Sequence, residues 1–497
     1  MIRVQSAPAV PLHNFWNNFH FHPTDAIEDD WGRRILDTAA ADRVGDTVRM
    51  YAMLEDIVSM DETGELRYDF TLNDTRLDYM LSKGYGIFLS YNFIPPCIAS
   101  DPGVTSSVSK NKTRYKGKRI TTSVPKDWAL WEEICYRYTA HIVARYGADV
   151  VSQWRLQCYN EPDVVSFFMT ELGPGEAQNL IRLENYKKLY AGFERGVLRA
   201  CPDLHIGGPS IGGGRVFMDG FLDFIKTGNH RLDFVCFHTY GTGPHALNDG
   251  TGRFHAENTL KKHQAMQAII DKYFPEGIEV IVDEWGAATC GFWNREECPA
   301  LMLREDSRFA AYYGKMITAY VNAGVKLSKL MICLSGQHEM TTDFSGFRGF
   351  FTLHFIKKPI YNAYVLTRKL RETRVPASCG NPDASVLASR GADGSGAVLV
   401  SYASEYFDSA LPDLDETVEI EGVTGRRHVT VWCIDEQHTN PCRYAEERGW
   451  DDPQGEQVEV LRRVAELQPL YEADMDADGT LRVPVHCTNN ALLLIEF

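Results

Sequence analysis

Short apolar runs alternate with amphipathic segments along the chain as far as residue 372. The apolar runs predict buried strands, and segments whose apolar residues recur every three or four positions predict helices. The clearest helix is expected at 127–146, where Gly147 marks its end. Strands are expected at 12–16, 48–51, 86–91, 154–158, 205–208, 234–237, 279–283 and 330–334.

This succession of strands and intervening helices is typical of a (β/α)8 (TIM) barrel of the α/β class, which we place at residues 12–372. Further helices are expected at 30–41, 77–83, 185–200, 260–273, 308–323 and 360–371. In such a barrel the chemistry lies at the carboxyl ends of the strands. Polar residues that directly follow a strand are therefore the first candidates for a functional site.

Beyond residue 372 the apolar residues alternate with period two. Strands are expected at 397–402, 417–423, 428–434, 481–485 and 491–497. They predict an all-β sandwich domain over residues 373–497, and residues 1–11 could join it through a strand at 2–5. The acidic stretch 436–479 is expected to be a surface excursion with one amphipathic piece at 458–467.

Charge and cysteine content narrow the classes of partner and cofactor. The formal net charge of -16 argues against nucleic acids and anionic membrane surfaces, because both attract basic patches. The 12 cysteines include no C-x-x-C pair, so neither a zinc knuckle nor a disulfide framework is indicated, and we expect no metal or other cofactor. The amino terminus lacks the apolar stretch of a signal peptide, which favours a cytoplasmic protein.

The tetrapeptide Asn160–Asp163 follows the fourth expected strand. Because Pro162 cannot donate to a sheet and disfavours a helical residue before it, Glu161 is expected at the strand tip in an extended conformation. A plain turn is the alternative, since Asn, Pro and Asp all favour turns. A second glutamate, Glu284, follows the seventh expected strand and favours the catalytic interpretation. Glycoside hydrolysis requires two such carboxyl groups, an acid/base and a nucleophile or base.

Several other residues have both a functional and a structural interpretation. Arg49 could orient a catalytic carboxylate or bind a sugar acid, or it could form a plain structural ion pair. Arg348 could clamp a uronate carboxylate, or it could be a loop arginine that faces solvent. His20 and His22 could ligate a metal, but no partner ligand is evident, and loop histidines lining a cleft are the simpler interpretation. Trp285, next to the second glutamate, is expected to offer a stacking platform rather than to pack the barrel rim.

Short motifs follow one another over nearly the whole chain: Val48-Arg49, 92–100 (N-F-I-P-P-C-I-A-S), Arg145-Tyr146-Gly147, Asn160-Glu161-Pro162, Gly207-Gly208-Pro209, 237–241 (F-H-T-Y-G) and Lys358-Pro359 with 361–364 (Y-N-A-Y). In this order they resemble glycoside hydrolase family 39, the family of β-xylosidases and α-L-iduronidases. The resemblance implies a TIM barrel with a β-sandwich and a retaining mechanism. It implies that Glu161 is the acid/base and Glu284 the nucleophile, and that the sugar site includes Asn160, His238 and Tyr240; we add Phe93, from the second motif.

The motifs do not agree on the sugar. Pro162-Asp163 is as in the iduronidases, whereas 238–241 (H-T-Y-G) resembles the xylosidases and lacks the lysine that iduronidases carry nearby. We expect an exo-acting retaining glycosidase of β-xylosidase type that acts on a small glycoside or an oligosaccharide. A uronidase or another exo-glycosidase, such as an arabinosidase or galactosidase, is the alternative. A metal-dependent hydrolase and a non-catalytic carbohydrate-binding protein are more remote, and a homo-oligomer could form.

The charge of the pocket separates the two leading alternatives. A uronidase must hold a carboxylate beside two glutamates, so it needs a cation besides the one that balances the nucleophile. If Arg49 balances Glu284, Arg348 is the remaining candidate for that cation. An Arg348 guanidinium in the cleft, within reach of the C5 substituent of a sugar, would exclude the xyloside, and one on the outer rim in solvent would exclude the uronide.

Overall fold

Eight parallel strands close into a barrel in the computed structural model, which describes residues 1–21, 30–106, 120–243, 256–289, 291, 293–334, 340, 342–404, 406 and 409–497. The strands are β3 (Asn18–Phe21), β4 (Thr47–Tyr51), β7 (Gly86–Tyr91), β8 (Arg155–Cys158), β9 (Ile206–Ile211), β10 (Phe234–Thr242), β11 (Glu279–Ala288) and β12 (Lys329–Leu334). They pair in chain order, and β12 closes the ring on β3. The TIM barrel predicted from the sequence is confirmed.

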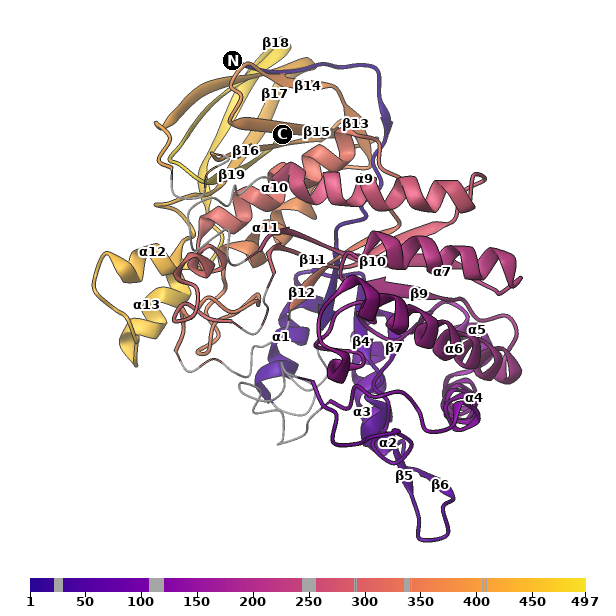
Figure 1. Ribbon diagram of the computed structural model, residues 1–497. Helices are drawn as coiled ribbons and strands as arrows, with labels where there is room; N and C mark the ends of the chain where they lie inside the picture. The colour runs from indigo at the N-terminus through magenta and orange to yellow at the C-terminus, as the bar shows by residue number, and fades with distance from the viewer. Residues whose placement is uncertain are drawn as a thin grey trace.

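Helices surround the barrel strands (Figure 1). They are α1 (Asp30–Ala41), α2 (Leu54–Ile57), α3 (Thr71–Ser82), α4 (Trp128–Tyr146), α5 (Ala148–Val151), α6 (Glu176–Ala200), α7 (Arg215–Thr227), α9 (Ala256–Tyr273), α10 (Ser307–Asn322) and α11 (Pro359–Thr367). Two 3-10 helices, η2 (Thr170–Leu172) and η3 (Pro299–Arg304), and the hairpin of β5 (Val58–Met60) and β6 (Leu66–Tyr68) lie in the connections. The predicted helix at 127–146 is α4, and Asp127 caps it by accepting a hydrogen bond from the Ala129 N–H at 2.9 Å.

The first barrel strand is β3 and not the segment 12–16, so that prediction was wrong. The Asn14 side chain accepts a hydrogen bond from the Asn17 N–H at 3.2 Å, and the chain turns there before the strand begins. In β3 a buried histidine, His20, interrupts the apolar sequence, which hid the strand from a search for apolar runs. Helices α3 and α6 also begin earlier than the sequence indicated.

The carboxyl-terminal domain is built on two long antiparallel strands, β17 (Leu414–Ile434) and β18 (Pro469–Cys487). The segments 417–423 and 428–434, expected as two strands, both belong to β17. The other strands are β1 (Ile2–Val4), β2 (Val10–Pro11), β13 (Thr373–Val375), β14 (Ala377–Cys379), β15 (Ala384–Arg390), β16 (Gly396–Tyr402) and β19 (Ala491–Glu496). All nine strands form one mixed sheet, in which β1 pairs with β17 and β14, and β2 pairs with β13. The boundary at residue 372 stays a prediction.

The acidic stretch 436–479 is not a simple surface excursion, and that prediction was wrong. Its last part belongs to β18, and two helices precede it, α12 (Pro441–Glu446) and α13 (Glu456–Val464). Apolar side chains of both helices form a small core with Phe344 and Ile356 of the barrel. The two helices therefore pack against the connection between β12 and α11.

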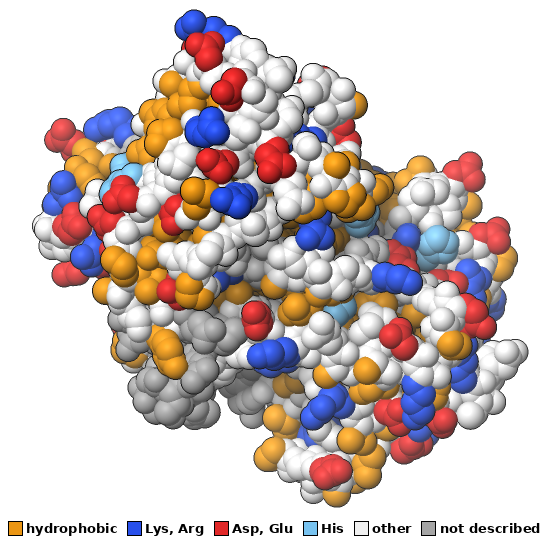
Figure 2. Space-filling view, turned by 90° about the horizontal axis from the view of Figure 1, so that it is seen from above, with side chains coloured by type: hydrophobic (Ala, Val, Ile, Leu, Met, Phe, Trp, Pro, Cys, Tyr) orange, Lys and Arg blue, Asp and Glu red, His pale blue; other side chains and the backbone are white. Residues whose placement is uncertain are grey.

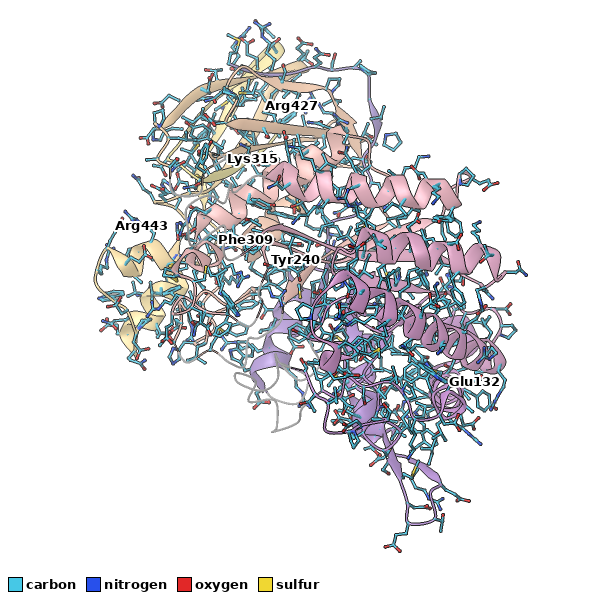
Figure 3. The ribbon with its side chains drawn as sticks, viewed as in Figure 1. Glu132, Tyr240, Phe309, Lys315, Arg427 and Arg443 are labelled. Atoms are coloured by element: carbon cyan, nitrogen blue, oxygen red, sulfur yellow. The ribbon has the colours of Figure 1, made fainter. Side chains whose placement is uncertain are left out.

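Helix α10 joins the barrel to the sheet domain (Figure 1). Lys315, labelled in Figure 3, donates hydrogen bonds to the carbonyl oxygens of Asp383 and Ala403 at 3.1 and 2.7 Å. A Cβ atom on Gly314 would lie 2.2 Å from Ser401 Oγ, so a glycine is needed for the helix to approach the sheet this closely.

The outer surface mixes charges of both signs. Figure 2 shows lysine and arginine side chains beside aspartate and glutamate side chains over one face of the molecule. Within the parts of the chain that the structure describes, no helix combines the length and apolar character needed to cross a membrane. The cytoplasmic location stays a prediction.

Candidate active site

A pocket of about 310 Å³ opens within the barrel. Seven of the candidate residues from the sequence line it: His20, Phe93, Asn160, Glu161, Tyr240, Glu284 and Arg348. Two more, Arg49 and His238, contact these residues while being only 0% and 3% exposed. Tyr240 on β10 is labelled in Figure 3. The residues meet because parallel strands of a barrel end together at one rim.

Hydrogen-bond donors surround the carboxyl group of Glu284. Arg49 Nη1 lies 2.8 Å from Oε1, and the Tyr240 hydroxyl donates to Oε2 at 2.7 Å. The Tyr51 hydroxyl lies 3.4 Å from Oε1. His20 Nδ1 is 3.2 Å from Oε1, but it is only 2.5 Å from Arg49 Nη1. Because an arginine nitrogen can only donate, His20 Nδ1 accepts this hydrogen bond, and the proton of the neutral ring lies on Nε2.

The three side-chain nitrogens of Arg49 all have partners besides Glu284. Nε donates to Gln157 Oε1 at 3.0 Å and lies 3.2 Å from Asp283 Oδ2. Nη2 donates to Asn160 Oδ1 at 2.6 Å and to Ser210 Oγ at 3.1 Å. The geometry fits both the orientation of the Glu284 carboxylate and a buried ion pair with Asp283, so the role of Arg49 stays a prediction. The same geometry leaves Arg49 little capacity to bind a sugar acid.

Two neighbouring bulges bring Asp283 and Ser210 into this network. The pairing of β10 with β11 passes from Val282 to Glu284 and skips Asp283, and the pairing of β9 with β10 skips Ser210. Successive strand residues normally point to opposite faces, and a bulge interrupts that alternation. Asp283 and Glu284 therefore both reach Arg49. Ser210 Oγ also donates to Asp283 Oδ2 at 2.7 Å.

Glu161 has a φ of 48° and is not extended, so that expectation was wrong. Its backbone N–H donates to the Ser210 carbonyl oxygen at 2.9 Å, which fixes this left-handed conformation. Its Oε1 lies 2.8 Å from His238 Nδ1, and the same nitrogen lies 3.6 Å from Glu284 Oε2. One donor atom from each of these three side chains lies within 4.8 Å of the other two. The carboxyl groups of Glu161 and Glu284 are therefore close together, with His238 beside both.

The loop at 212–214 packs against Glu161. A Cβ atom on Gly212 would lie 2.6 Å from Val164 Cγ2 and 3.2 Å from Glu161 Oε1, so a side chain here would crowd the glutamate. The N–H groups of Gly212 and Gly214 each donate to the Asp163 carboxylate at 2.8 Å. Asp163 thus anchors the loop that borders Glu161.

Burial and neighbouring charges move the pKa values of the two glutamates apart. Burial raises the pKa of Glu161, although its hydrogen bond with His238 offsets part of the rise. Burial would also raise the pKa of Glu284, but the positive charges around it, His238 first, hold that pKa well below its usual range. Burial would lower the pKa of His238, but the nearby carboxylates raise it to about 10. Burial and Arg49 lower the pKa of His20 to about 4. One glutamate is thus favoured as an acid and the other as an anion.

Arg348 is 9% exposed and lines the pocket, so the interpretation as a solvent-facing loop arginine was wrong. Its Nη1 donates to the Tyr240 hydroxyl at 2.7 Å, and Tyr240 in turn donates to Glu284. A Cβ atom on Gly291 would lie 1.5 Å from Arg348 Nη2. The guanidinium therefore lies against the backbone of Gly291, where only a glycine leaves room for it.

Trp285 does not form a stacking platform, and that prediction was wrong. Its side chain is 0% exposed and stacks on Tyr313 of α10 with ring centroids 5.7 Å apart, and Phe309 lies 5.8 Å away. The reason is strand alternation: Glu284 points toward the pocket, so the next residue points outward to the helices. His22, which the sequence analysis paired with His20 as a possible metal ligand, lies outside the described residues.

Three groups of side chains in the described part of the chain have donor atoms close enough to hold a metal ion. The groups are His20, Glu284 and Cys333; Glu161, His238 and Glu284; and Cys433, Asp435 and His438. In the first group Arg49 already donates to the histidine and the glutamate. In the third, Asp435 accepts hydrogen bonds from the backbone N–H groups of Gln437, His438 and Thr488 at 2.9, 2.7 and 3.0 Å. In the first and third groups, therefore, the donor atoms fit hydrogen-bond networks better than metal centres.

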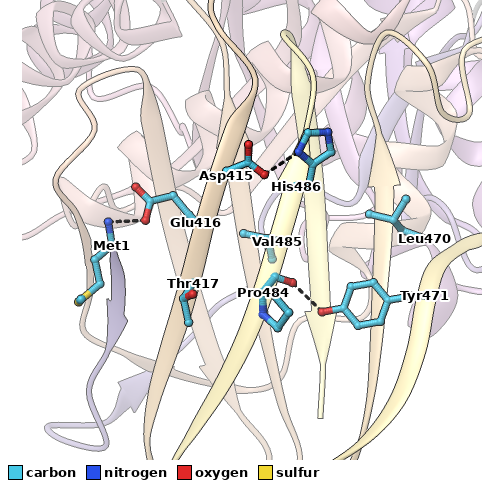
Figure 4. Close-up of a pocket in the computed structure, with 9 residues that line it drawn as sticks. All are labelled: Met1, Asp415, Glu416, Thr417, Leu470, Tyr471, Pro484, Val485 and His486. Carbon is cyan, nitrogen blue, oxygen red and sulfur yellow. Dashed lines mark hydrogen bonds and ion pairs between the residues drawn. The ribbon is translucent and has the colours of Figure 1, made fainter.

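A larger groove of about 690 Å³ lies on the sheet domain, over the paired strands β17 and β18 (Figure 4). Its polar groups pair with one another. His486 Nδ1 lies 2.8 Å from Asp415 Oδ1, and the Tyr471 hydroxyl donates to the Pro484 carbonyl oxygen at 2.6 Å. The groove is larger than the barrel pocket, but it holds no counterpart of the two close glutamates.

The residues of the pocket and its network that the sequence did not single out include Tyr51, Ser210, Asp283 and Cys333. Tyr51 follows Arg49 by two positions in a strand, so its place on the same face could have been predicted. Ser210 and Asp283 depend on the two bulges, for which the sequence carries no signal. Cys333 lines the pocket from the end of the last strand, but no motif surrounds it.

Comparison with known proteins defines the family. Residues 1–482 match the family described as glycosyl hydrolases family 39. The chain belongs to this family. It is therefore a glycosidase, and the resemblance inferred from the motifs is confirmed.

Individual relatives of this family 39 member lie at low sequence identity. It is 23% identical over 478 residues to a β-xylosidase of Caldicellulosiruptor saccharolyticus, covering 92% of this chain and 89% of that protein. It is 25% identical over 270 residues to the α-L-iduronidase of Canis lupus familiaris, covering 49% of this chain and 36% of that protein. The crystal structure of a monomeric β-xylosidase from Caulobacter crescentus CB15 has a TM-score of 0.81 at 20% identity, covering 100% of this chain and 98% of that one. This last likeness supports the fold.

Proposed function

We propose that this family 39 member is an exo-acting retaining glycosidase, with Glu161 as acid/base and Glu284 as nucleophile. The observation that carries the proposal is that the closest oxygens of the two carboxyl groups lie within 4.8 Å. Retaining glycosidases hold these groups about 5–5.5 Å apart, whereas inverting ones need about 6.5–9.5 Å to admit a water molecule. The short separation supports a double displacement.

In the first step a Glu284 oxygen bonds to the anomeric carbon while the bond to the glycosidic oxygen breaks. Glu161 gives its proton to that oxygen, and the aglycone leaves as an alcohol. Glu161 Oε1 accepts from His238, so Oε2 is the atom that carries the proton to the substrate. The raised pKa of Glu161 supports this acid role, and the lowered pKa of Glu284 supports its role as an anion.

In the second step a water molecule attacks the anomeric carbon of the glycosyl-enzyme. Glu161, now a carboxylate, takes the proton of the water, and the bond between the sugar and Glu284 breaks. Both glutamates return to their starting states, and two inversions give overall retention. Arg49 and Tyr240, which contact the two oxygens of Glu284, stabilise the carboxylate as it leaves.

Three residues are proposed to hold the sugar. Asn160 Oδ1 accepts from Arg49, which directs the amide so that Nδ2 can donate to a hydroxyl group. His20 Nε2 is buried, has no hydrogen-bond partner among the described residues and carries the proton, so it is a second donor. Phe93 supplies an apolar wall. The pocket volume of about 310 Å³ is near the lower limit for small-molecule sites, which supports binding of one terminal sugar.

For the sugar itself we propose a neutral β-xyloside. The relative that covers 92% of the chain is a β-xylosidase, whereas the iduronidase match covers 49%. A xyloside needs hydroxyl partners and an apolar wall but no cation. A cytoplasmic location and self-association are also proposals, which cell fractionation and light scattering of the purified protein would test.

A uronide is the second candidate, and the position of Arg348 favours it. A substrate carboxylate between two glutamates needs a cation, and Arg49 is already engaged with Glu284 and Asp283. Arg348 lines the same pocket and is therefore placed to supply that charge. Arabinosides and galactosides are neutral, so, like a xyloside, they would need no cation in the pocket.

A set of aryl glycosides tests these assignments: xyloside, iduronide, arabinoside and galactoside. We expect the xyloside to have the highest kcat/KM. We expect Arg348→Met to change kcat/KM for all neutral substrates by a similar factor. If the wild type hydrolyses the iduronide best, and Arg348→Met loses this activity selectively, the proposed substrate is a uronide and not a xyloside. Hydrolysis of none of the four, by protein with a wild-type unfolding transition, would contradict the proposal.

A further inference from the structure

Arg348 lies in a connection without regular secondary structure, residues 342–350, between β12 and α11. Neither a helix nor a sheet ladder fixes this part of the chain. Even so, Phe347, Arg348 and Phe350 are only 4%, 9% and 0% exposed. Backbone hydrogen bonds hold two points of the segment, from the Arg295 N–H to the Ser345 carbonyl oxygen and from the Lys358 N–H to the Phe350 carbonyl oxygen, both at 2.9 Å. Side chains from neighbouring elements hold the part between them.

One buried ion pair contacts the segment directly before Arg348. Glu305 and Lys358 are both 0% exposed, and Lys358 Nζ lies 2.8 and 2.7 Å from the two carboxylate oxygens. Glu305 Oε1 also accepts from the Gly346 N–H at 2.7 Å, and Lys358 Nζ also donates to the Phe347 carbonyl oxygen at 3.0 Å. The ion pair therefore holds the backbone of the two residues that precede Arg348.

We propose that Glu305 and Lys358 are positioning residues that fix Arg348 in the pocket and so help to determine which substrates bind. The proposal rests on the proposed function, because it assumes that Arg348 meets the substrate. Neither residue is among the side chains that line the pocket. They act through hydrogen bonds to the backbone of Gly346 and Phe347.

Stability alone gives little reason for this ion pair. A buried ion pair contributes about as much as two well-packed apolar side chains, and often less. What distinguishes this ion pair from two apolar side chains is that each partner also makes one hydrogen bond to the backbone of the segment. Gly346 is held on its other side as well, since Arg304 Nη1 donates to its carbonyl oxygen at 3.1 Å. Its φ of 80° lies in the region that favours glycine.

Positioning matters because Arg348 has little room to move. Its guanidinium lies between the Tyr240 hydroxyl at 2.7 Å and the backbone of Gly291. Tyr240 in turn donates to Glu284, so a shift of Arg348 would also disturb the proposed nucleophile. A displacement of about 1 Å in such a site can cost about 100-fold in rate.

The test compares Glu305→Gln/Lys358→Met with the wild type on whichever aryl glycoside the wild type hydrolyses best. The double variant removes both charges, because a single substitution would leave one buried charge unpaired and could prevent folding. We expect kcat/KM, per titrated active site, to fall about 10- to 100-fold, with KM raised because Arg348 meets the substrate and kcat lowered because its shift disturbs Glu284. In an Arg348→Met background the same double substitution should change kcat/KM less than about twofold, because the side chain that it positions is absent.

The matched control is Arg155→Met/Glu279→Gln, which removes an ion pair of 2.7 Å at the opposite, amino-terminal ends of β8 and β11. It should lower Tm and leave KM unchanged. A crystal structure of the Glu305→Gln/Lys358→Met variant gives a readout independent of activity, and we expect it to lack the hydrogen bond between Arg348 and Tyr240. Retention of that bond, an unchanged KM, or full additivity with Arg348→Met would overturn the proposal. A wild type that hydrolyses no glycoside would instead contradict the proposed function, while the crystal structure would still test the positioning.

Discussion

Arg49 Nη1 lies 2.8 Å from Glu284 Oε1, and Arg49 Nε lies 3.2 Å from Asp283 Oδ2. One buried cation therefore faces two carboxylates on consecutive residues, which a bulge in β11 turns toward the same side. Inside a barrel this interaction is much stronger than in water. It favours the ionised form of Glu284, which the proposed mechanism requires.

Arg49→Met should raise the pKa of Glu284, because it removes a buried positive charge beside the carboxylate. We expect the acid limb of the pH profile of kcat/KM to move to higher pH. The free energy of unfolding should fall by about 3–5 kcal/mol at neutral pH, since two buried carboxylates lose their partner. Arg67→Met is the control, because Arg67 forms an ion pair with Asp61 that solvent reaches: the Arg67 side chain is 61% exposed and the Asp61 side chain 24%. An acid limb that stays in place would refute the role given to Arg49.

The two glutamates should respond differently to substitution. Glu161→Ala should keep activity on aryl glycosides with very good leaving groups, because these need no protonation, and added azide should accelerate it by attacking the glycosyl-enzyme. Glu284→Ala should lose activity on all substrates and should not recover a retained product with azide. The measurement is initial rate against leaving-group pKa, with and without azide. If both variants give the same pattern, the assignment of roles is wrong.

His238 should make stability depend on pH. Its pKa rises from the usual 6.5 to about 10 in the folded protein, because the carboxylates of Glu284, Asp283 and Glu161 surround it. The folded state therefore holds the proton more tightly than the unfolded state. The resulting stabilisation is fully present below pH 6.5 and is lost as the pH rises toward 10. Urea unfolding between these pH values should show a steeper fall for the wild type than for His238→Gln, and parallel curves would contradict this.

Trp285 should contribute to stability and not to sugar binding. Its buried ring packs on Tyr313 and Phe309, so Trp285→Ala should lower the free energy of unfolding by about 3–5 kcal/mol. Trp285→Phe keeps most of the packing and should leave KM for the best aryl glycoside unchanged. A KM that rises severalfold in Trp285→Phe, with normal unfolding, would restore the stacking interpretation.

The barrel could be predicted because its strands and helices repeat regularly and because apolar runs mark most of the strands. The first strand was misplaced because His20 interrupts its apolar pattern. The same residue lines the pocket. Glu161 and Glu284 could be found because an apolar run of the sequence precedes each of them. The conformation of Glu161 could not, because its backbone is fixed by a hydrogen bond to Ser210, a contact distant in sequence.

Residues outside the strand pattern were harder to predict. Arg348 lies in an irregular segment, and the backbone of the two residues before it is held by Glu305 and Lys358, which are distant in sequence from each other. Acidic composition suggested that 436–479 was solvated, but the apolar faces of α12 and α13 pack on the barrel. In both cases the position of the segment depends on contacts with residues distant in sequence, and a short stretch of sequence gives no information about those contacts.

Trapping of the glycosyl-enzyme tests the central claim most directly. The 2-deoxy-2-fluoro derivative of the best aryl glycoside should react with the protein, because its deglycosylation is slow, and mass spectrometry of the digested protein would locate the label. The account predicts one sugar per chain, bonded to Glu284 and absent in Glu284→Gln. A label on another residue, or no label from a derivative whose parent is readily hydrolysed, would contradict it.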